Sequence, residues 1–178
     1  MSDASEDLGR EEIAWSGKWI TAKRRGKWEY VSRARDIRAA VIIAIDEDDH
    51  VLLVDQYRVP LGKRCLELPA GLIGDEHADD TVLGAARREL IEETGYDCAR
   101  AESLGDYYSS PGMVSESFTL VRATGLTRVG EGGGVADEDI LVHRVPRADI
   151  PGFVAAKRAE GLGIDVKLLL LLSGALLG

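Results

Sequence analysis

Three glutamates lie within one helical turn of one another in the segment Arg88-Glu89-Leu90-Ile91-Glu92-Glu93-Thr94-Gly95-Tyr96. If the segment is helical, Glu89 and Glu93 face the same way and Glu92 lies beside them. Carboxylates this close repel one another, and a divalent cation relieves that repulsion. Their oxygens suit hard cations such as Mg²⁺ and Mn²⁺. The spacing therefore predicts a metal site, in which Arg88 orients one carboxylate through its fork of hydrogen bonds.

A glutamate-rich helix face has a second interpretation, since most such faces are simply solvated. Two features favour the metal site. Like charges at this spacing cost some helix stability when no cation is present. In addition, the segment follows the turn Pro69-Ala70-Gly71, where a backbone without a Cβ atom can approach a ligand closely.

The helix that positions these glutamates is expected over Asp80–Thr94, because apolar residues recur there at helical spacing. Asp79, Asp80 or Thr81 can cap its start, and Gly95 can end it. The pattern thus places the whole acidic cluster in the last two turns of one helix.

The remaining segments predict several strands and two further helices. Ala39–Ile45 is an apolar, β-branched run typical of a buried strand, and Val51–Val54 is expected to be its hairpin partner after a polar turn. Strands with helices at separate points indicate a mixed α/β layered domain of the α+β kind. The other expected elements are short strands within Ile13–Val31 around a turn at Arg25-Gly26, strands at Cys65–Leu68 and near Ala101–Tyr107, Ser115–Ala123 and Ile140–Val145, a helix near Ala148–Glu160, and a final helix from Asp165.

Composition bounds the function classes. The 178 residues are 45% hydrophobic and 30% charged, which fits a soluble globular domain. The net charge of −9 argues against broad nucleic-acid binding but permits a phosphate substrate that a carboxylate-bound metal attracts. Cys65 and Cys98 lack the spacing of a zinc site. The polar first residues do not fit a signal peptide, and the apolar run 168–177 is too short to cross a bilayer, so we expect a cytoplasmic protein whose last helix is buried.

Arg88 to Tyr96 resembles the second half of the Nudix box, whose pattern is G-x5-E-x7-R-E-U-x-E-E-x-G-U. The first half is irregular: strict counting places the glycine at Gly74, whereas the segment Leu66 to Ile73 resembles the usual lead-in and places it at Gly71, with three extra residues before the helix. We favour Gly71, because the Pro-Ala-Gly turn is the more constrained geometry. In either alignment Asp80 replaces the first glutamate of the box.

The resemblance implies a fold and a metal site. The fold would be a Nudix-type α/β/α sandwich with a mixed sheet and a small N-terminal antiparallel β subdomain. The implied organisation is a frayed segment over 1–11, a β segment over 12–35 and a Nudix domain over 36–178. Glu89 and Glu93 would bind Mg²⁺ directly, with Mn²⁺ able to substitute, and the Ala70 carbonyl would complete the site. Glu92 would bind a further metal or a bound water, and Glu67 would touch substrate or metal unless it is a plain surface residue.

Other segments resemble the ADP-ribose pyrophosphatase branch of that family. They are Trp28-Glu29-Tyr30-Val31, Asp55-Gln56-Tyr57-Arg58, Leu66–Gly71 and Ser110-Pro111-Gly112, with Pro111 as the branch marker. Arg58 is the candidate for holding the diphosphate, because a guanidinium group matches phosphate oxygens in pairs. Arg38 is a second candidate, although a solvated strand edge explains it better. The resemblance places Glu116 near the terminal ribose.

The implied reaction is hydrolysis of a nucleoside diphosphate derivative, most specifically ADP-ribose to AMP and ribose 5-phosphate. A carboxylate from the loop that follows Gly130–Gly134 would act as general base. Glu138 is the preferred residue and Asp137 the competitor, and the glycines predict a mobile loop. The alternatives are a sugar-nucleotide or dinucleoside-polyphosphate hydrolase on the same scaffold, a nucleotide-binding domain without activity, and a structural domain with an acidic surface.

The N-terminal segment carries all three tryptophans but is too short to bury a core of its own. It could pack on its own domain. The family resemblance favours instead a homodimer in which this segment crosses to the partner. Trp28 would then stack on the base of the substrate in the partner's site. Trp15 and Trp19 are expected in the core or the dimer interface.

Overall fold

Two sheets of four strands form the centre of the protein in the residues that the computed structural model describes, which are 8–34, 37–73, 81–135 and 138–177. Their strands are β4 (Arg38–Ala44), β5 (His50–Arg58), β6 (Lys63–Glu67), β7 (Ala70–Ile73), β8 (Tyr96–Tyr108), β9 (Ser117–Arg128), β10 (Leu141–Pro146) and β11 (Gly163–Ile164). The strand orders are β7-β4-β9-β8 and β10-β5-β6-β11. Each sheet is mixed, because β4 and β9 run parallel, as do β11 and β6, whereas the other neighbours are antiparallel.

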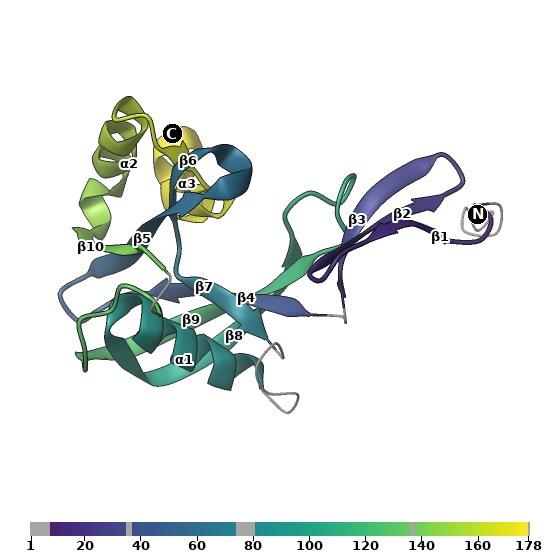
Figure 1. The fold of residues 1–178 in the computed structure, drawn as a ribbon. Helices are drawn as coiled ribbons and strands as arrows, with labels where there is room; N and C mark the ends of the chain where they lie inside the picture. The colour runs from purple at the N-terminus through teal and green to yellow at the C-terminus, as the bar shows by residue number, and fades with distance from the viewer. Residues whose placement is uncertain (1–7, 35–36, 74–80, 136–137, 178) are drawn as a thin grey trace.

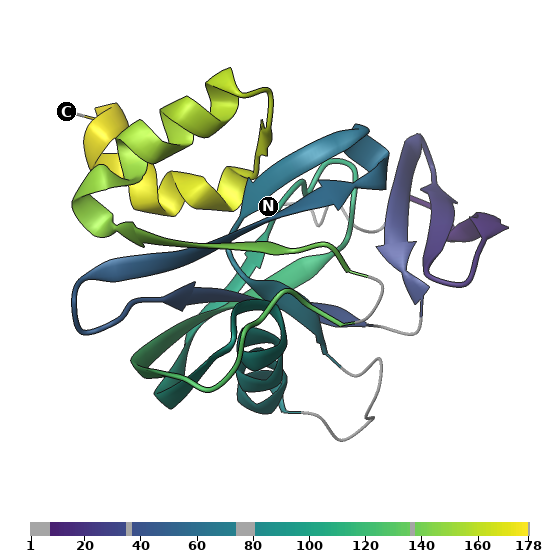
Figure 2. The ribbon, with the colours of Figure 1, turned by 60° about the vertical axis from the view of Figure 1, so that its left-hand side comes forward.

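Helices cover both outer faces of the two sheets (Figures 1 and 2). Helix α1 (Val82–Thr94) lies against the sheet that contains β4, and α2 (Ile150–Ala159) and α3 (Leu169–Leu177) lie together on the opposite side. Three short 3₁₀ turns complete the elements, at Val59–Leu61, Arg147–Asp149 and Val166–Leu168. The predicted α/β/α sandwich with mixed sheets is confirmed.

Strand β4 separates two hydrophobic layers. Its side chains alternate between the faces of the sheet, so Ala40, Ile42 and Ala44 join the layer under α1, whereas Val41 joins the layer under α2 and α3. Ile42 and Leu52 are fully buried in the first layer. The strand is therefore apolar on both faces, as its sequence predicted.

The ends of α1 follow from local sequence. Thr81 is the cap residue, and its Oγ1 accepts a hydrogen bond of 3.1 Å from the Gly84 N–H. Gly95 ends the helix with a left-handed φ of 75°. Both agree with the prediction, although the helix begins at Val82 rather than Asp80.

The predicted hairpin of β4 and β5 is wrong. The two strands lie in different sheets, and the connection between them has one isolated bridge, from Ile45 just after β4 to Val51. The side chains of residues 51–54 are all buried, so β5 needs cover on both faces and pairs with β6 and β10 instead.

Two strands were missed. The prediction ended a strand at Pro69, but the chain pairs with β4 immediately afterwards as β7, and the Pro69 carbonyl accepts a hydrogen bond of 2.8 Å from Ile42 N–H. Strand β11 is only Gly163–Ile164, too short for a periodic signal.

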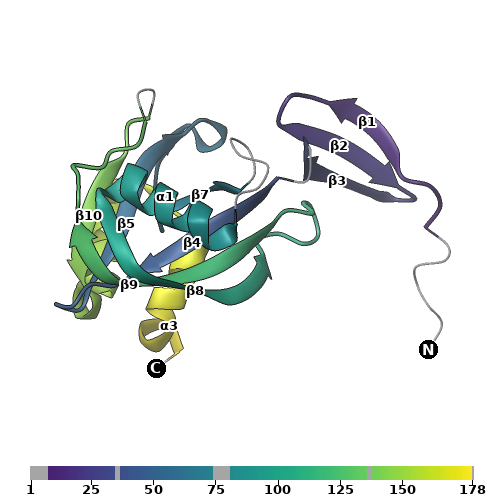
Figure 3. The same ribbon diagram turned by 90° about the horizontal axis from the view of Figure 1, so that it is seen from below.

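The N-terminal segment forms a separate three-stranded antiparallel sheet that projects from the body (Figures 1 and 3). Its strands are β1 (Glu12–Ser16), β2 (Ile20–Arg25) and β3 (Trp28–Arg33), with Gly26 at the predicted turn. Two backbone hydrogen bonds of 3.0 Å tie Val31 to Met113 and Ser115 of the same chain. The predicted division at residues 35 and 36 lies outside the described residues, as do residues 1–7 of the predicted frayed segment.

The C-terminal run is only partly buried. Leu168 and Leu172 lie in the layer under α2 and α3, whereas Leu169 and Leu170 are about half exposed. The prediction of a buried last helix is therefore correct for one face of α3. Among the described residues, no helix has the length and apolar character to cross a bilayer.

Candidate active site

A cleft of about 370 Å³ lies where several elements meet. Its lining comes from strands β3 to β7, β9 and the loop before it, α1, the segment before β10 and the 3₁₀ turn before α3. It contains most of the predicted site residues. The described residues that line it are the acids Glu67, Glu89, Glu93, Glu116 and Glu138, the bases Arg33, Arg58 and Lys167, and Ala39, Val41, Gln56, Ala70, Gly71, Leu72, Ser109 and Phe118. The predicted metal ligands and the predicted diphosphate-binding arginine thus share one cavity.

Glu93 is the most buried acid of the cleft, with 4% of its surface exposed. Its Oε2 accepts a hydrogen bond of 3.0 Å from the Ala70 N–H. Burial, reinforced by the negative charges of Glu89 and Glu138, raises the pKa of Glu93 to about 8. A carboxylate that is this costly to ionise requires either a proton or a cation, so its environment fits a metal ligand.

Glu89 approaches the backbone at Gly71. A Cβ atom added to Gly71 would lie 1.9 Å from the Glu89 Cδ atom, so only glycine leaves room for this carboxylate. Arg88 lies beside it, with Nη2 3.4 Å from the Glu89 Oε1. The close approach supports Gly71 as the glycine of the box. Gly74 and Asp80, which the other alignment uses, lie outside the described residues.

A second acidic group lies far from this cleft, on the turn between β4 and β5. Among the described residues, only Asp46, Asp48 and His50 form a trio whose ligand atoms all lie within 4.8 Å of one another. Arg144 pairs with both aspartates of this trio: its Nε lies 2.6 Å from an oxygen of Asp46, and its Nη2 lies 2.6 Å from an oxygen of Asp48. Within the described residues, the ion pairs of this turn account for its acidic side chains without a metal.

Two arginines enter the cleft already held by acids. Arg58 forms a bidentate pair with the buried Glu67, at 2.7 Å and 2.8 Å, and this contact raises the pKa of Arg58. Arg33 Nε donates to Glu116 Oε1 at 2.6 Å. Glu67 therefore orients a basic side chain here, a role that the sequence did not predict.

The loop that carries Glu138 is docked on α1. Gly133 N–H donates to the Glu93 carbonyl at 2.8 Å, and Gly134 N–H donates to the Glu92 carbonyl at 3.0 Å. The three glycines 132–134 all have positive φ, and a Cβ atom on Gly132 would lie 2.4 Å from the Thr94 carbonyl carbon. The prediction that the glycines make this loop mobile is thus replaced by a tight fit to the end of the helix. Glu138 is exposed at the edge of the cleft, and Asp137 lies outside the described residues.

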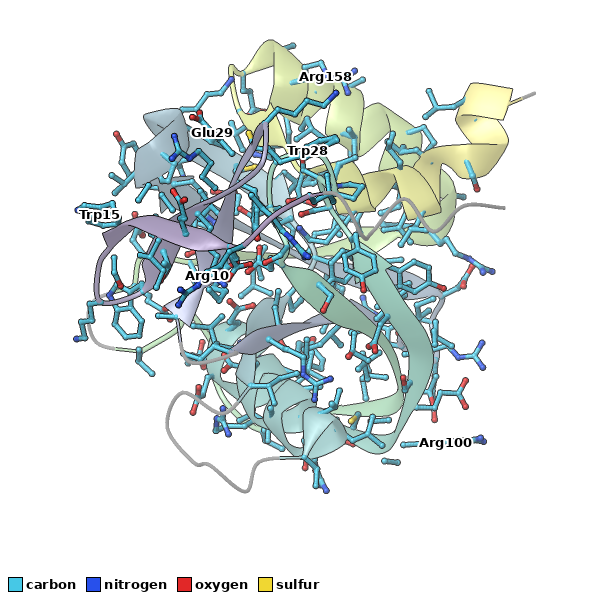
Figure 4. All side chains as sticks on the ribbon, turned by 90° about the vertical axis from the view of Figure 1, so that its right-hand side faces the viewer. Arg10, Trp15, Trp28, Glu29, Arg100 and Arg158 are labelled. Atoms are coloured by element: carbon cyan, nitrogen blue, oxygen red, sulfur yellow. The ribbon has the colours of Figure 1, made fainter. Side chains whose placement is uncertain are left out.

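Three predicted site residues do not line the cleft of their own chain. Glu92 is half-buried on α1, and Arg38 is exposed at the start of β4, a strand that lies between β7 and β9 rather than at the edge of its sheet. Trp28 is 49% exposed and lies in a separate hollow with Pro111. Figure 4 shows Trp15 at the outer rim of the same sheet; with exposures of 57% and 46%, Trp15 and Trp19 are not core residues.

The sequence also missed two basic residues of the cleft. Arg33 lies at the end of β3, and no local motif in the sequence marked it as a residue of the cleft. Lys167 belongs to the 3₁₀ turn before α3, where its Nζ lies 2.6 Å from Asp165 and 5.7 Å from the Phe118 ring centroid. No local motif surrounds Lys167, and only the tertiary fold brings it to the cleft.

Several known proteins resemble this chain in sequence. The chain is 40% identical over 107 residues to the methanol dehydrogenase activator of Bacillus methanolicus, covering 60% of this chain and 56% of that protein. It is 36% identical over 143 residues to the GDP-mannose pyrophosphatase of Cronobacter sakazakii, covering 75% and 70% respectively. It is 41% identical over 92 residues to the ADP-ribose pyrophosphatase of Mycobacterium tuberculosis, covering 52% and 44%.

The fold has a solved counterpart. The crystal structure of an ADP compounds hydrolase matches with a TM-score of 0.70 over 94% of this chain and 91% of that one, at 23% identity, which shows a shared fold. The first three curated relatives are each covered over 56% to 58% of their own length. A model of the NUDIX domain matches residues 35–159, and the chain therefore belongs to the Nudix hydrolase family.

Proposed function

We propose that the protein hydrolyses the diphosphate bond of a nucleoside diphosphate derivative, with ADP-ribose as substrate and AMP and ribose 5-phosphate as products. One observation carries the proposal: a single cleft holds the buried Glu93 beside Glu89, and faces them with Arg58 and Arg33. The first pair suits a metal and the second suits phosphate oxygens. The relative named ADP-ribose pyrophosphatase supports this choice of substrate.

The cleft needs a cation to accept a diphosphate. Five glutamates and three basic side chains line its described part, and Arg58 and Arg33 are each paired with one of those glutamates. We therefore assign Mg²⁺, with Mn²⁺ able to substitute, to Glu89, Glu93 and the Ala70 carbonyl. Glu92 would serve a further metal or a bound water. This agrees with the general use of divalent metals in the Nudix family.

Each residue of the cleft then has its own role in the reaction. Arg58 and Arg33 hold the non-bridging oxygens of the diphosphate, and Glu116 faces the ribose beyond it. Glu138 takes a proton from the water that attacks one phosphorus atom, and the bond from that phosphorus to the bridging oxygen breaks. A Mg²⁺ ion held by Glu89, Glu93 and the Ala70 carbonyl would supply positive charge to the diphosphate and would lower the pKa of that water.

A second substrate class has its own support. The relatives named GDP-mannose pyrophosphatase include one that is 36% identical and covered over 70% of its length. A sugar nucleotide would place the same diphosphate on the same arginines. The choice between the two then depends on the groups at either end of the substrate.

The partner in this proposal is a second copy of the chain. The three tryptophans of the N-terminal sheet are 46% to 57% exposed, which is unusual for the largest apolar side chain. A twofold dimer would cover them and bring Trp28 to the base in the partner's site.

A substrate panel in H₂¹⁸O tests the function. ADP-ribose, GDP-mannose and a dinucleoside polyphosphate are incubated with Mg²⁺ or with EDTA, and the products are identified by mass. We expect AMP and ribose 5-phosphate, with ¹⁸O in only one of them. Faster turnover of GDP-mannose would favour the second class. Nucleotide binding without turnover of any compound would instead identify a non-catalytic domain.

A further inference from the structure

The loop that carries Glu138 is fastened at both ends. We call residues 130–140 the base loop, of which the structure describes 130–135 and 138–140. Its first half is bonded to the α1 carbonyls of Glu92 and Glu93, as described above. The end of the loop leads directly into β10, so whatever fixes Asp139 also limits where Glu138 can lie.

Arg64 fixes that end. From β6, its Nη1 donates to Asp139 Oδ2 at 2.7 Å and its Nη2 donates to the Asp139 carbonyl at 2.9 Å. The same guanidinium group donates through Nη2 to the Asp55 carbonyl at 2.7 Å and through Nε to the Asp55 carboxylate. One side chain thus binds both the backbone and the carboxylate of two aspartates.

Asp55 is a rigid anchor for this arginine. Only 2% of its surface is exposed, and its second carboxylate oxygen lies 2.5 Å from His143 Nε2. Burial alone would raise the pKa of Asp55, but hydrogen bonds from His143 and Arg64 hold it below its usual value. The anchor therefore stays charged and does not release Arg64.

We propose that Arg64 is a positioning residue that sets the place of Glu138 at the edge of the cleft, acting from the buried Asp55 through Asp139. The inference rests on the proposed function, in which Glu138 is the general base. Arg64 itself does not line the cleft in the described part of the chain. It acts on the reaction only through the loop.

A purely stabilising role predicts different effects. Asp139 is 81% exposed at its side chain, and an ion pair with so exposed a carboxylate contributes little to the free energy of unfolding. The geometry of the base matters much more, since a misplacement of about 1 Å can cost roughly 100-fold in rate. Arg64→Gln also removes a partner of the buried Asp55, so some stability is lost as well, and the split between kcat and KM in a protein shown to be folded separates the two roles.

The first test separates turnover from binding. In Arg64→Gln we expect kcat to fall about 10- to 100-fold while KM stays within about threefold, and Arg64→Lys to recover only part, because lysine cannot bind both aspartates in parallel. Arg144→Gln is the matched control. Arg144 also bridges two aspartates, Asp46 and Asp48, but lies outside the cleft. The kcat of Arg144→Gln should therefore stay within about twofold of the wild-type value.

The second test asks whether Arg64 acts through Glu138. The double variant Arg64→Gln/Glu138→Gln should be no slower than Glu138→Gln alone, because a base that is absent cannot be misplaced. Mn²⁺ affinity, measured by calorimetry, should not change in Arg64→Gln. Three results would each overturn the proposal. They are a kcat of the double variant that falls by the product of the two single losses, an unchanged kcat in Arg64→Gln, and an unchanged kcat in Glu138→Gln.

Hydrogen exchange distinguishes this failure from failure of the proposed function. Amide protons of Glu138 and Ile140 donate within the base loop and should exchange faster in Arg64→Gln than in Arg144→Gln, with or without substrate. Equal exchange would exclude the clamp even if the enzyme is active. If the wild-type protein is inactive but exchange is faster in Arg64→Gln, Arg64 holds the loop without serving catalysis. That result would reject this inference together with the proposed function.

Discussion

Large side chains are paired or buried in the cleft, whereas they are about half exposed on the N-terminal sheet. In the cleft, Arg58 and Arg33 are each bonded to an acid, and Glu93 is almost fully buried. On the sheet, Trp15 and Trp28 are about half exposed. The contacts of the cleft lie within one chain, whereas the sheet presents apolar surface that its own chain does not cover. Changes in the cleft should therefore act on any substrate and at any protein concentration, and changes on the sheet should depend on a partner.

The largest effect is expected from Glu93→Gln. It keeps the shape of the side chain but removes the charge that we assign to the metal, so kcat should fall by about 1,000-fold or more with the fold intact. EDTA should abolish the activity of the wild type. Steady-state kinetics with circular dichroism as a control for folding would measure this.

Glu102→Gln, an acid on β8 away from the cleft, should keep wild-type rates. Full activity of Glu93→Gln, or of the wild type in EDTA, would remove the metal from the cleft.

Glu93 also predicts how the metal-free protein responds to pH. Its pKa is raised to about 8 in the fold from 4.5 in the unfolded chain, so the folded state holds a proton that the unfolded state releases. The stability gained from that proton is complete below pH 4.5 and is lost as the pH rises through about 8. The free energy of unfolding should fall by up to about 1.4 kcal/mol per pH unit in this window.

Glu93→Gln removes this dependence, since the amide does not titrate. Urea unfolding in EDTA between pH 5 and 9 would compare the two proteins. We expect the variant to be the more stable one at pH 8. Parallel pH profiles would mean that Glu93 is ionised without a metal.

Gly71→Ala should have a smaller effect on the same cleft. The added Cβ would lie 1.9 Å from Glu89 Cδ, which is the mobile end of a side chain, so the carboxylate must move while the fold remains. We expect kcat to fall about 10- to 100-fold, with weaker Mn²⁺ binding. Gly152→Ala on α2 is the control, because a Cβ there meets nothing within 4 Å and Gly152 does not line the cleft. Unchanged Mn²⁺ affinity in Gly71→Ala would show that Glu89 is not a ligand in this position.

The sequence predicted the cleft well where function and local structure coincide. Glu89 and Glu93 are one turn apart on a helix whose ends Thr81 and Gly95 mark by local hydrogen bonding, so their spacing placed them together and the resemblance to the Nudix box singled them out. Lys167 and Arg64 act across long sequence distances, and only the pairing of β6 with β5 and β11 brings them into place. The false hairpin has the same origin, because a strand buried on both faces carries no sign of which neighbour covers it.

The N-terminal sheet is the part that sequence predicts least, because the role that we propose for it depends on a second chain. We expect a homodimer at micromolar concentration, measured by light scattering. Trp28→Ala should raise KM for ADP-ribose about 5- to 100-fold with little change in kcat, since stacking on a base contributes roughly 1–3 kcal/mol. Trp28→Phe keeps an aromatic ring and should retain most of the affinity. A monomer would count against the whole arrangement, and a dimer with unchanged KM would reject the stacking role alone.

Mixed dimers decide whether Trp28 serves its own cleft or the partner's. One chain carries Trp28→Ala and an intact cleft; the other carries Glu93→Gln and an intact Trp28. If Trp28 crosses to the partner, the intact cleft of the first chain receives the tryptophan of the second, and the co-expressed pair should show a population of sites with wild-type KM. If Trp28 serves its own chain, each site lacks one of the two groups and no such population exists. The hollow of Trp28 beside Pro111, separate from the cleft that holds Glu93, favours the crossed arrangement. A mixture whose KM equals that of Trp28→Ala would show that the tryptophan does not reach the partner's cleft. The sheet would then act only within its own chain, as the cleft does.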